Sequence, residues 1–228
     1  TVAGNVKGAQ TALNARIIRE AAGFDTDVPI CAGAPRPLVR EPVTAEDFHG
    51  STGLGNLDFP APRHALSKSH AVNMIVRTCR AARKDPITVV VTGPMTNLAL
   101  ALTMSPEIAD GIEEIVLMGG ADKEGGNITP YAEFNVYADP HAAASSKLEF
   151  SAMGDRDAPL HDPTTIIAVT RPDLFKGRQA RVEIVTEPGE QVGRTIPHFC
   201  DDGHVLWYEE ADDAGIFEEL CRLLGGYE

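Results

Sequence analysis

Cysteine is scarce in this sequence of 228 residues, which holds only Cys31, Cys79, Cys200 and Cys221. No two of these residues form a C-x-x-C pair, and their wide spacing gives no zinc or disulfide framework. We therefore expect four free thiols in a reducing compartment, and we predict a cytoplasmic protein.

Long apolar runs are also missing. The sequence has no stretch of about 18 apolar residues that would cross a bilayer. It also shows no charged segment followed by a short apolar one, which is the pattern of a secretory signal. This stretch of chain therefore predicts no membrane partner and no secretory route.

Positive charge is in deficit, because 20 Lys and Arg residues face 33 Asp and Glu residues, for a net charge of -13. This balance disfavours nucleic acid and anionic membranes as partners. It is compatible with a divalent cation or a neutral small molecule as ligand. The hydrophobic share of 43% and the charged share of 23% are those of a globular protein and exclude a disordered tail.

Apolar runs alternate with segments of helical periodicity in the first half of the chain. The periodicity predicts helices over 9–23, over 70–84 and from 95 onward. Short apolar runs predict strands over 28–33, 87–92 and 114–120. The β-α-β unit across 87–120 favours parallel pairing. The predicted fold class is therefore α/β, with an open, mostly parallel, Rossmann-like sheet flanked by helices.

Two Asp-Pro pairs predict further helix starts, because Asp is favoured at the N-cap and Pro at the first helical position. These pairs are Asp139-Pro140 and Asp162-Pro163. The last third of the chain has a different pattern, which predicts antiparallel strands over 182–187 and 204–209 and an amphipathic helix over 216–224.

Polar residues follow the predicted strands, and ligands of open parallel sheets bind at the carboxyl ends of strands. The oxygen atoms of Asn, Glu, Asp and Thr suit Ca²⁺ or a polyhydroxylated sugar. The candidate residues at these positions and in nearby loops are Asn5, His49, Thr92, Asn127, Glu133, Asn135, His161 and Asp162.

Each candidate also has a purely structural interpretation. Asp162 fits a helix N-cap, and Asn127 follows two glycines and fits a turn. Glu133 and Asn135 would share one face of a strand, pointing away from Phe134, and two such residues could simply face water. His49 lies in a glycine-rich loop, which is a weak signal by itself.

Taken in order, these residues lie within long stretches that resemble the inosine–uridine-preferring nucleoside hydrolases. The matching stretches are TVAGN at 1–5, VPICAGAPRPLVR at 28–40, HGSTGLG at 49–55, ITVVVTGPMTNLALAL at 87–102, EIVLMGGADKEGGNITPYAEFNVYADPHAA at 114–143 and PLHDPTTIIAV at 159–169. The resemblance covers residues 1 to about 170 well and the tail only loosely. It implies a single nucleoside hydrolase-like domain over 1–228.

The resemblance implies a reaction as well. Such enzymes hydrolyse the N-glycosidic bond of ribonucleosides to ribose and a free base through an oxocarbenium-like ribosyl centre. A bound Ca²⁺ would hold the ribose hydroxyls and the attacking water. The implied partner is a small-molecule ribonucleoside, and the implied assembly is a homodimer or homotetramer.

The resemblance also implies roles for individual residues. The backbone carbonyl of Thr92 and the carboxylate of Asp162 correspond to Ca²⁺ ligands. Met118 corresponds to an apolar residue near the sugar. His161 would help the leaving base depart, and His49 would lie near that base. The residues that would bind ribose hydroxyls are Asn5, Asn127, Glu133 and Asn135.

The sequence departs from the family pattern in two places. The motif D-x-D-x-x-x-D-D, which would supply further Ca²⁺ ligands and the general base, is absent, so no residue here can be nominated as general base. We expect the chain to lack the first β-α unit and an internal segment around 144–150. Two alternatives therefore stay open: an inactive truncated homologue that binds nucleoside or ribose, and a structural partner subunit. Purine or pyrimidine preference also stays open, with His161 favouring purines.

Overall fold

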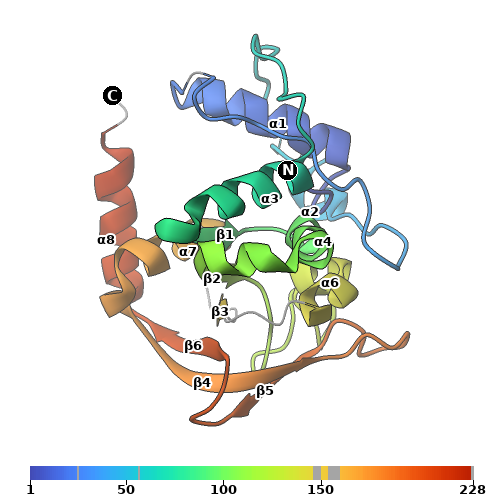
Figure 1. Cartoon of the computed structure of the whole chain (residues 1–228), viewed down its shortest axis with the longest axis vertical. Coiled ribbons are helices and arrows are strands. Elements are labelled where there is room, and N and C mark those ends of the chain that lie inside the picture. Colours follow the sequence, from blue (N-terminus) through green and yellow to red (C-terminus); the bar gives the residue numbers. More distant parts are fainter. Residues whose placement is uncertain (25, 56, 146–149, 154–159, 227–228) are drawn as a thin grey trace.

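The computed structural model describes residues 1–24, 26–55, 57–145, 150–153 and 160–226, and nothing beyond the backbone is described for 150–153. One six-stranded sheet and the helices around it make up this part of the chain (Figure 1). The strands are β1 (Ile87–Val91), β2 (Ile112–Met118), β3 (Phe150–Met153), β4 (Phe175–Ile184), β5 (Thr195–Phe199) and β6 (Val205–Ala211).

The sheet has the strand order β1-β2-β3-β6-β4-β5. Strands β1, β2, β3 and β6 pair in parallel, whereas β4 pairs antiparallel with β6 and with β5. The predicted α/β class with a mostly parallel sheet is therefore confirmed, as is the antiparallel pairing near the C-terminal end. Strand β5 was not predicted, because it contains Pro197; as an edge strand it tolerates the missing N–H donor.

Eight α-helices accompany the sheet in the described residues, with 3₁₀ turns at Ala82–Lys84, Pro106–Gly111 and Pro172–Leu174. None of these helices is long and apolar enough to span a bilayer. The helices are α1 (Gly8–Ala21), α2 (Glu46–His49), α3 (Ala71–Ala81), α4 (Thr96–Met104), α5 (Phe134–Ala138), α6 (Pro140–Ser145), α7 (His161–Thr170) and α8 (Asp213–Leu224).

Residues 115–118 of β2 are buried on both faces, as expected for a parallel strand between two helical layers. Ile115 and Leu117 pack on one face with α4, α6 and Trp207 of β6. Val116 points to the other face, where it joins Ile167 of α7 and residues of α8. Strand β1 lies at an edge of the described sheet and is only half-buried. Successive residues of β2 thus hold two helix layers on one sheet.

The strand predicted over 28–33 is wrong. This segment is extended, but its carbonyls accept single hydrogen bonds from separate parts of the chain rather than from one neighbouring strand. Ala32 accepts from the N–H of Ala71, and Ile30 accepts from that of Ser67. A ladder needs one continuous partner, so this apolar run becomes a connecting segment instead.

The helix start predicted at Asp139 is confirmed. Its side chain is fully buried, and its Oδ1 accepts the backbone N–H of Ala142 in the first turn of α6 at 3.1 Å. Its Oδ2 accepts from the backbone N–H of Leu38 at 2.9 Å and from Oγ1 of Thr96 at 2.6 Å. One carboxylate therefore joins α6, α4 and the segment before α2.

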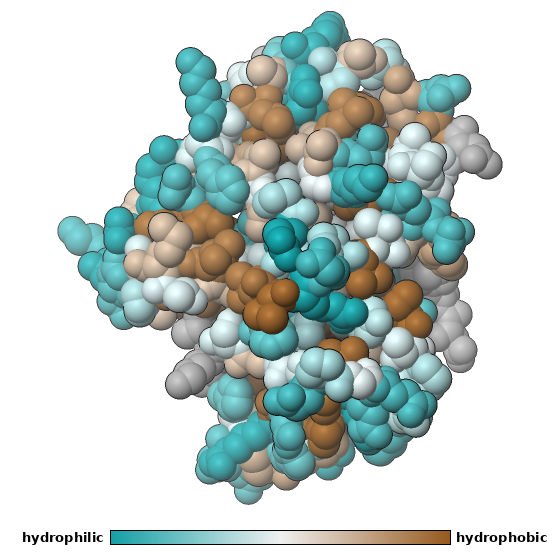
Figure 2. All heavy atoms as spheres, turned by 90° about the vertical axis from the view of Figure 1, so that its right-hand side faces the viewer, coloured by the Kyte–Doolittle hydropathy of each residue, from teal (hydrophilic) through white to brown (hydrophobic). Residues whose placement is uncertain are grey.

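Large apolar side chains also reach the surface, among them Val39, Phe48 and Leu57. On the face of the molecule shown in Figure 2, apolar side chains form several patches separated by polar ones. In Figure 1, α1 lies over α3, on the side of the molecule away from β4 and β5.

Candidate functional site

The candidate site lies where the parallel strands end. Thr92 directly follows β1, and Met118 is the last residue of β2. The short helix α5 and the first turn of α7 supply the other polar candidates, and α2 ends with His49. Residues from five places in the sequence therefore contribute to one region.

Glu133 is the N-cap of α5, and its side chain satisfies several backbone donors. Its Oε1 accepts the N–H of Asn135 at 2.8 Å, and its Oε2 accepts that of Val136 at 3.1 Å. Oε2 also accepts the N–H of Gly120, from the loop that follows β2, at 3.3 Å. A carboxylate with 2% exposure thus ties the helix start to the end of the strand.

Burial raises the pKa of Glu133 to about 7, and the nearby negative charge of Asp162 acts in the same direction. The three backbone N–H groups lower this pKa but do not overcome the loss of water. Near neutral pH this carboxyl group therefore exists in both protonation states. Such a group can accept or donate a proton at the pH of the cell.

Asn135 is the second residue of α5, and it is 8% exposed. Its Nδ2 donates to the backbone carbonyl of Met118 at 3.0 Å and approaches the sulfur of Met118 at 3.1 Å. The expectation that Glu133 and Asn135 share a wetted strand face is wrong. They are the N-cap and second residue of a helix, and both are buried.

Asn127 is exposed and serves the loop before α5. Its Oδ1 accepts the backbone N–H of Phe134 at 2.8 Å. The side-chain oxygen of Asn127 therefore stabilises the turn before α5, as its structural interpretation predicted. The Nδ2 group of the same side chain can donate a hydrogen bond to a ligand.

Asp162 is not the N-cap of α7, contrary to the structural interpretation of the Asp-Pro pair. The helix begins at His161, and the N-cap is Leu160. Asp162 therefore lies in the first turn, where a negative charge interacts favourably with the helix dipole. Within the described part of the chain, no side-chain hydrogen bond caps the start of α7.

The charges around Asp162 bring the candidates together. Removal of water raises the pKa of Asp162, whereas the neighbouring side chains of His161 and His49 lower it. Asp162 in turn acts on Glu133. Helices α2, α5 and α7 thus place two histidines and two carboxyl groups within electrostatic reach of one another.

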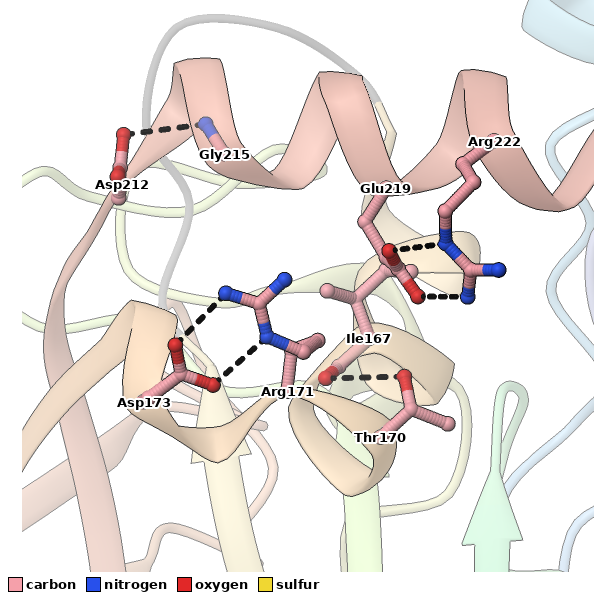
Figure 3. Close-up of polar contacts among 8 residues, drawn as sticks. All are labelled: Ile167, Thr170, Arg171, Asp173, Asp212, Gly215, Glu219 and Arg222. Carbon is pink, nitrogen blue, oxygen red and sulfur yellow. Dashed lines mark hydrogen bonds and ion pairs between the residues drawn. The ribbon is translucent and has the colours of Figure 1, made fainter.

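The other end of α7 lies beside α8, and Arg171, just after α7, pairs with Asp173 of the following 3₁₀ turn (Figure 3). The guanidinium group of Arg171 makes two hydrogen bonds with Asp173, at 2.9 and 2.7 Å. Ile167 of α7 and Ile216 of α8 belong to one buried cluster. Helix α7 therefore packs against both β2 and α8.

The segment that contains Asn5 lies close to the segment that contains Thr92. A Cβ atom added to Gly4 would be 3.1 Å from Cδ of Pro94, and one added to Gly93 would be 3.3 Å from Cγ1 of Val2. The segment with Asn5 therefore packs directly on the residues after β1. No hydrogen bond within the described residues joins the side chain of Asn5 or Thr92 to Glu133 or Asp162.

The described donors do not complete a Ca²⁺ site. Among the residues that the structure describes, no three His, Cys, Asp or Glu side chains form a group that could hold a metal ion. The Asp162 carboxylate and the Thr92 carbonyl are two donors, whereas Ca²⁺ takes six to eight oxygens. These residues alone therefore do not fit the ion that the resemblance implies.

Gly120, whose N–H donates to Glu133, was not among the site residues predicted from the sequence. The pair of glycines that follows the apolar run of β2 is the feature that could have indicated it. Gly120 has φ = 90°, and a Cβ atom there would be 2.9 Å from the ring of Trp207. Only glycine combines that conformation with that space.

Comparison with known proteins identifies the enzyme family of this chain. The family described as "Inosine-uridine preferring nucleoside hydrolase" matches residues 1–147. The pyrimidine-specific ribonucleoside hydrolase RihA of Shewanella woodyi is 34% identical over 279 aligned positions, which cover 100% of this chain and 88% of that protein. The chain belongs to the inosine-uridine preferring nucleoside hydrolase family.

Members of this nucleoside hydrolase family are glycosidases that act on N-glycosyl bonds, and the chain is an enzyme of this class. The inosine-uridine preferring nucleoside hydrolase of Crithidia fasciculata is 43% identical over 144 positions, covering 63% of this chain and 45% of that protein. A purine-preferring ribonucleoside hydrolase from Gardnerella vaginalis has a TM-score of 0.90 and 24% identity, covering 99% of this chain and 88% of that one. This structural likeness shows the nucleoside hydrolase fold.

Proposed function

We propose that this chain hydrolyses the N-glycosidic bond of ribonucleosides, releasing ribose and a free base. The single observation that carries the proposal is the buried Glu133 beside Asp162, with His161 and His49 close to that pair. The family membership gives the reaction class. The arrangement offers carboxylate and amide groups for a polyhydroxylated ring, with histidines beside them.

Glu133 and Asn135 are proposed to bind the ribose hydroxyls. A carboxylate has about four lone-pair sites, and backbone N–H groups occupy three on Glu133. One site is thus left for a hydroxyl donor. The Nδ2 of Asn135 is engaged by Met118, which orients the Oδ1 of Asn135 as an acceptor. Asn5 and Asn127 complete the proposed sugar contacts.

His161 is proposed to assist departure of the base. Cleavage of the bond leaves a pair of electrons on the base nitrogen, and a proton donor lowers the barrier. The side chain of His161 lies close enough to Asp162 for their charges to interact. His49 is proposed to lie near the base. We infer from His161 that purine nucleosides are among the substrates.

We also propose that the enzyme uses Ca²⁺, with the carboxylate of Asp162 and the backbone carbonyl of Thr92 as two of its oxygen ligands. Because the described residues supply too few ligands, no step is assigned to the ion. Turnover that survives exhaustive chelation would contradict this proposal.

A second candidate function is nucleoside or ribose binding without hydrolysis, either by an inactive homologue or by a structural partner subunit. It is favoured by the absence of the D-x-D-x-x-x-D-D motif and of a residue to nominate as general base. Release of reducing sugar from inosine and uridine decides between the candidates. Calorimetry that shows binding without release would support the second one.

We also propose a single domain over 1–228 that lacks the first β-α unit and is shortened around 144–150, where residues 146–149 lie outside the described part of the chain. Two facts support it. The family match ends at residue 147. The alignment with the Schizosaccharomyces pombe protein C1683.06c spans 276 positions, more than the residues of this chain, at 33% identity over 99% of this chain and 89% of that protein. A homodimer or homotetramer in the cytoplasm is likewise proposed, and light scattering tests the assembly.

A further inference from the structure

The loop that carries His49 is attached to the protein at both of its ends. We call residues 45–55 the His49 loop. At its start, the N–H of Ala45 donates to the backbone carbonyl of Asn5 at 2.9 Å. Near its end, the carbonyl of Thr52 accepts from Nδ2 of Asn14 at 2.7 Å. Asn14 belongs to α1, so the two attachments come from separate elements.

Asn14 is a polar side chain that is only 8% exposed, and burial of a polar group lowers stability unless it is hydrogen-bonded. Its Oδ1 accepts from Nε2 of Gln10, one turn earlier in α1, at 2.8 Å. This contact fixes the amide so that its Nδ2 group points to Thr52. A residue of the same helix therefore helps to orient the amide of Asn14 toward Thr52.

Gly53 lets the His49 loop lie directly on this part of the protein. It has φ = 72°, and an added Cβ atom would be 3.0 Å from Cγ1 of Val6 and 3.2 Å from Nδ2 of Asn14. A side chain there would be strained by its backbone and would push the loop away. The close contact between the His49 loop and α1 thus depends on both Asn14 and Gly53.

The same loop turns back onto His49. The N–H of Gly55 donates to the carbonyl of His49 at 3.1 Å, and Oγ1 of Thr52 donates to the carbonyl of Gly55 at 3.2 Å. A displacement of Thr52 would therefore move His49. Helix α1 holds the following loop in a similar way, because Arg16 donates to the carbonyl of His64 and Glu20 accepts its N–H.

We propose that Asn14 is a positioning residue, which holds Thr52 so that His49 stays beside Asp162 at the base end of the bound nucleoside. The proposal rests on the proposed function for the role of His49. It assigns to the buried polar face of α1 a role in positioning the His49 loop at the active site.

Hydrogen exchange tests the attachment without any substrate. Asn14→Asp keeps the size of the side chain and the acceptor for Gln10 but removes the donor to Thr52. The amides of Gly53 and Gly55 should exchange on the order of tenfold faster. Asn73→Asp, on the exposed face of α3, is the matched control and should leave them unchanged. Unchanged exchange in Asn14→Asp would overturn the proposal.

Kinetics test the functional part. The KM for a nucleoside should rise on the order of tenfold in Asn14→Asp, with a smaller change in kcat, because the loop acts through substrate binding. Faster exchange with an unchanged KM would overturn the positioning role. Gly53→Ala should have the same effects, and it replaces Asn14→Asp if that variant does not fold. If the wild type hydrolyses nothing, the proposed function fails, whereas the exchange result still decides the attachment.

Discussion

The carboxylate of Glu133 accepts the backbone N–H of Gly120 at 3.3 Å, across 13 residues of chain. This bond joins the end of β2 to the start of α5, so that the same group caps a helix, closes a loop and faces the site. Its burial leaves the carboxyl partly protonated near neutral pH. The position of α5 and the acid–base properties of the site therefore both depend on the side chain of Glu133.

Replacement of this carboxyl should separate its two roles. Glu133→Gln keeps the shape but puts an NH₂ group where a backbone N–H needs an acceptor. We expect kcat/KM for inosine to fall on the order of 100-fold, because a charged acceptor for the sugar is lost. Glu113→Gln, on the exposed part of β2, is the control. Equal rates for both variants would remove Glu133 from the site.

The protein should become less stable as the pH rises toward neutral. The unfolded Glu133 releases its proton near 4.5, whereas the folded one keeps it until about 7. Between these values the native state binds more protons, so the free energy of unfolding falls with pH, by about 3 kcal/mol in full. The raised pKa of Asp162 acts in the same direction. Urea unfolding from pH ~5 to pH ~8 measures this slope.

Glu133→Gln is the comparison for that experiment. Its amide does not titrate, so its slope over the same pH range should be clearly shallower than that of the wild type. Parallel slopes for the two proteins would mean that Glu133 keeps an ordinary pKa in the folded state.

Asp162→Asn should remove metal binding with little change in the fold. The side chain caps no helix and carries the charge that a cation would need. Calorimetric titration with Ca²⁺ measures the loss, and turnover should fall with it. Asp201→Asn, an exposed residue near the end of β5, should bind Ca²⁺ like the wild type. Calcium-dependent turnover in Asp162→Asn would refute its assignment as a ligand.

His161→Ala should slow the release of poor leaving groups most. Inosine turnover should fall on the order of 100-fold, because the base must gain a proton. A riboside with p-nitrophenolate as leaving group should be affected little, since that anion is stable without a proton. His198→Ala, exposed on β5, is the control. Equal losses on both substrates would show that His161 does not act on the leaving group.

Thr96→Val should destabilise the protein by about 1–3 kcal/mol, because it leaves the fully buried Asp139 with one donor fewer. Thr103→Val, on the exposed side of the same helix, should change the free energy of unfolding by much less. Urea unfolding at constant pH compares the two. Similar values would mean that the contact between Thr96 and Asp139 contributes little.

Several features of this protein could be predicted from local sequence. The β-branched run over 87–92 and the apolar run over 114–120 predicted parallel strands correctly, because strand preference and burial on both faces act on neighbouring residues. The Asp139-Pro140 helix start was predicted for a similar reason. The family followed from long ordered motifs, and the comparisons confirmed it.

Other features depend on partners far away in the chain. The apolar run over 28–33 has the composition of a strand but meets no continuous partner, and Asp162 matches an N-cap pattern in a helix that starts one residue earlier. A local sequence pattern does not show which distant segment will lie beside it in the folded protein.

The sequence by itself determined the fold class, the family and the types of residue at the site. Only the tertiary structure decided that Glu133 is buried with a pKa of about 7, that His49 and His161 both lie near Asp162, and that Asn14 of α1 holds the His49 loop. The physical reason is that desolvation and charge interactions depend on distances between segments. Those distances exist only after the helices have packed on the sheet.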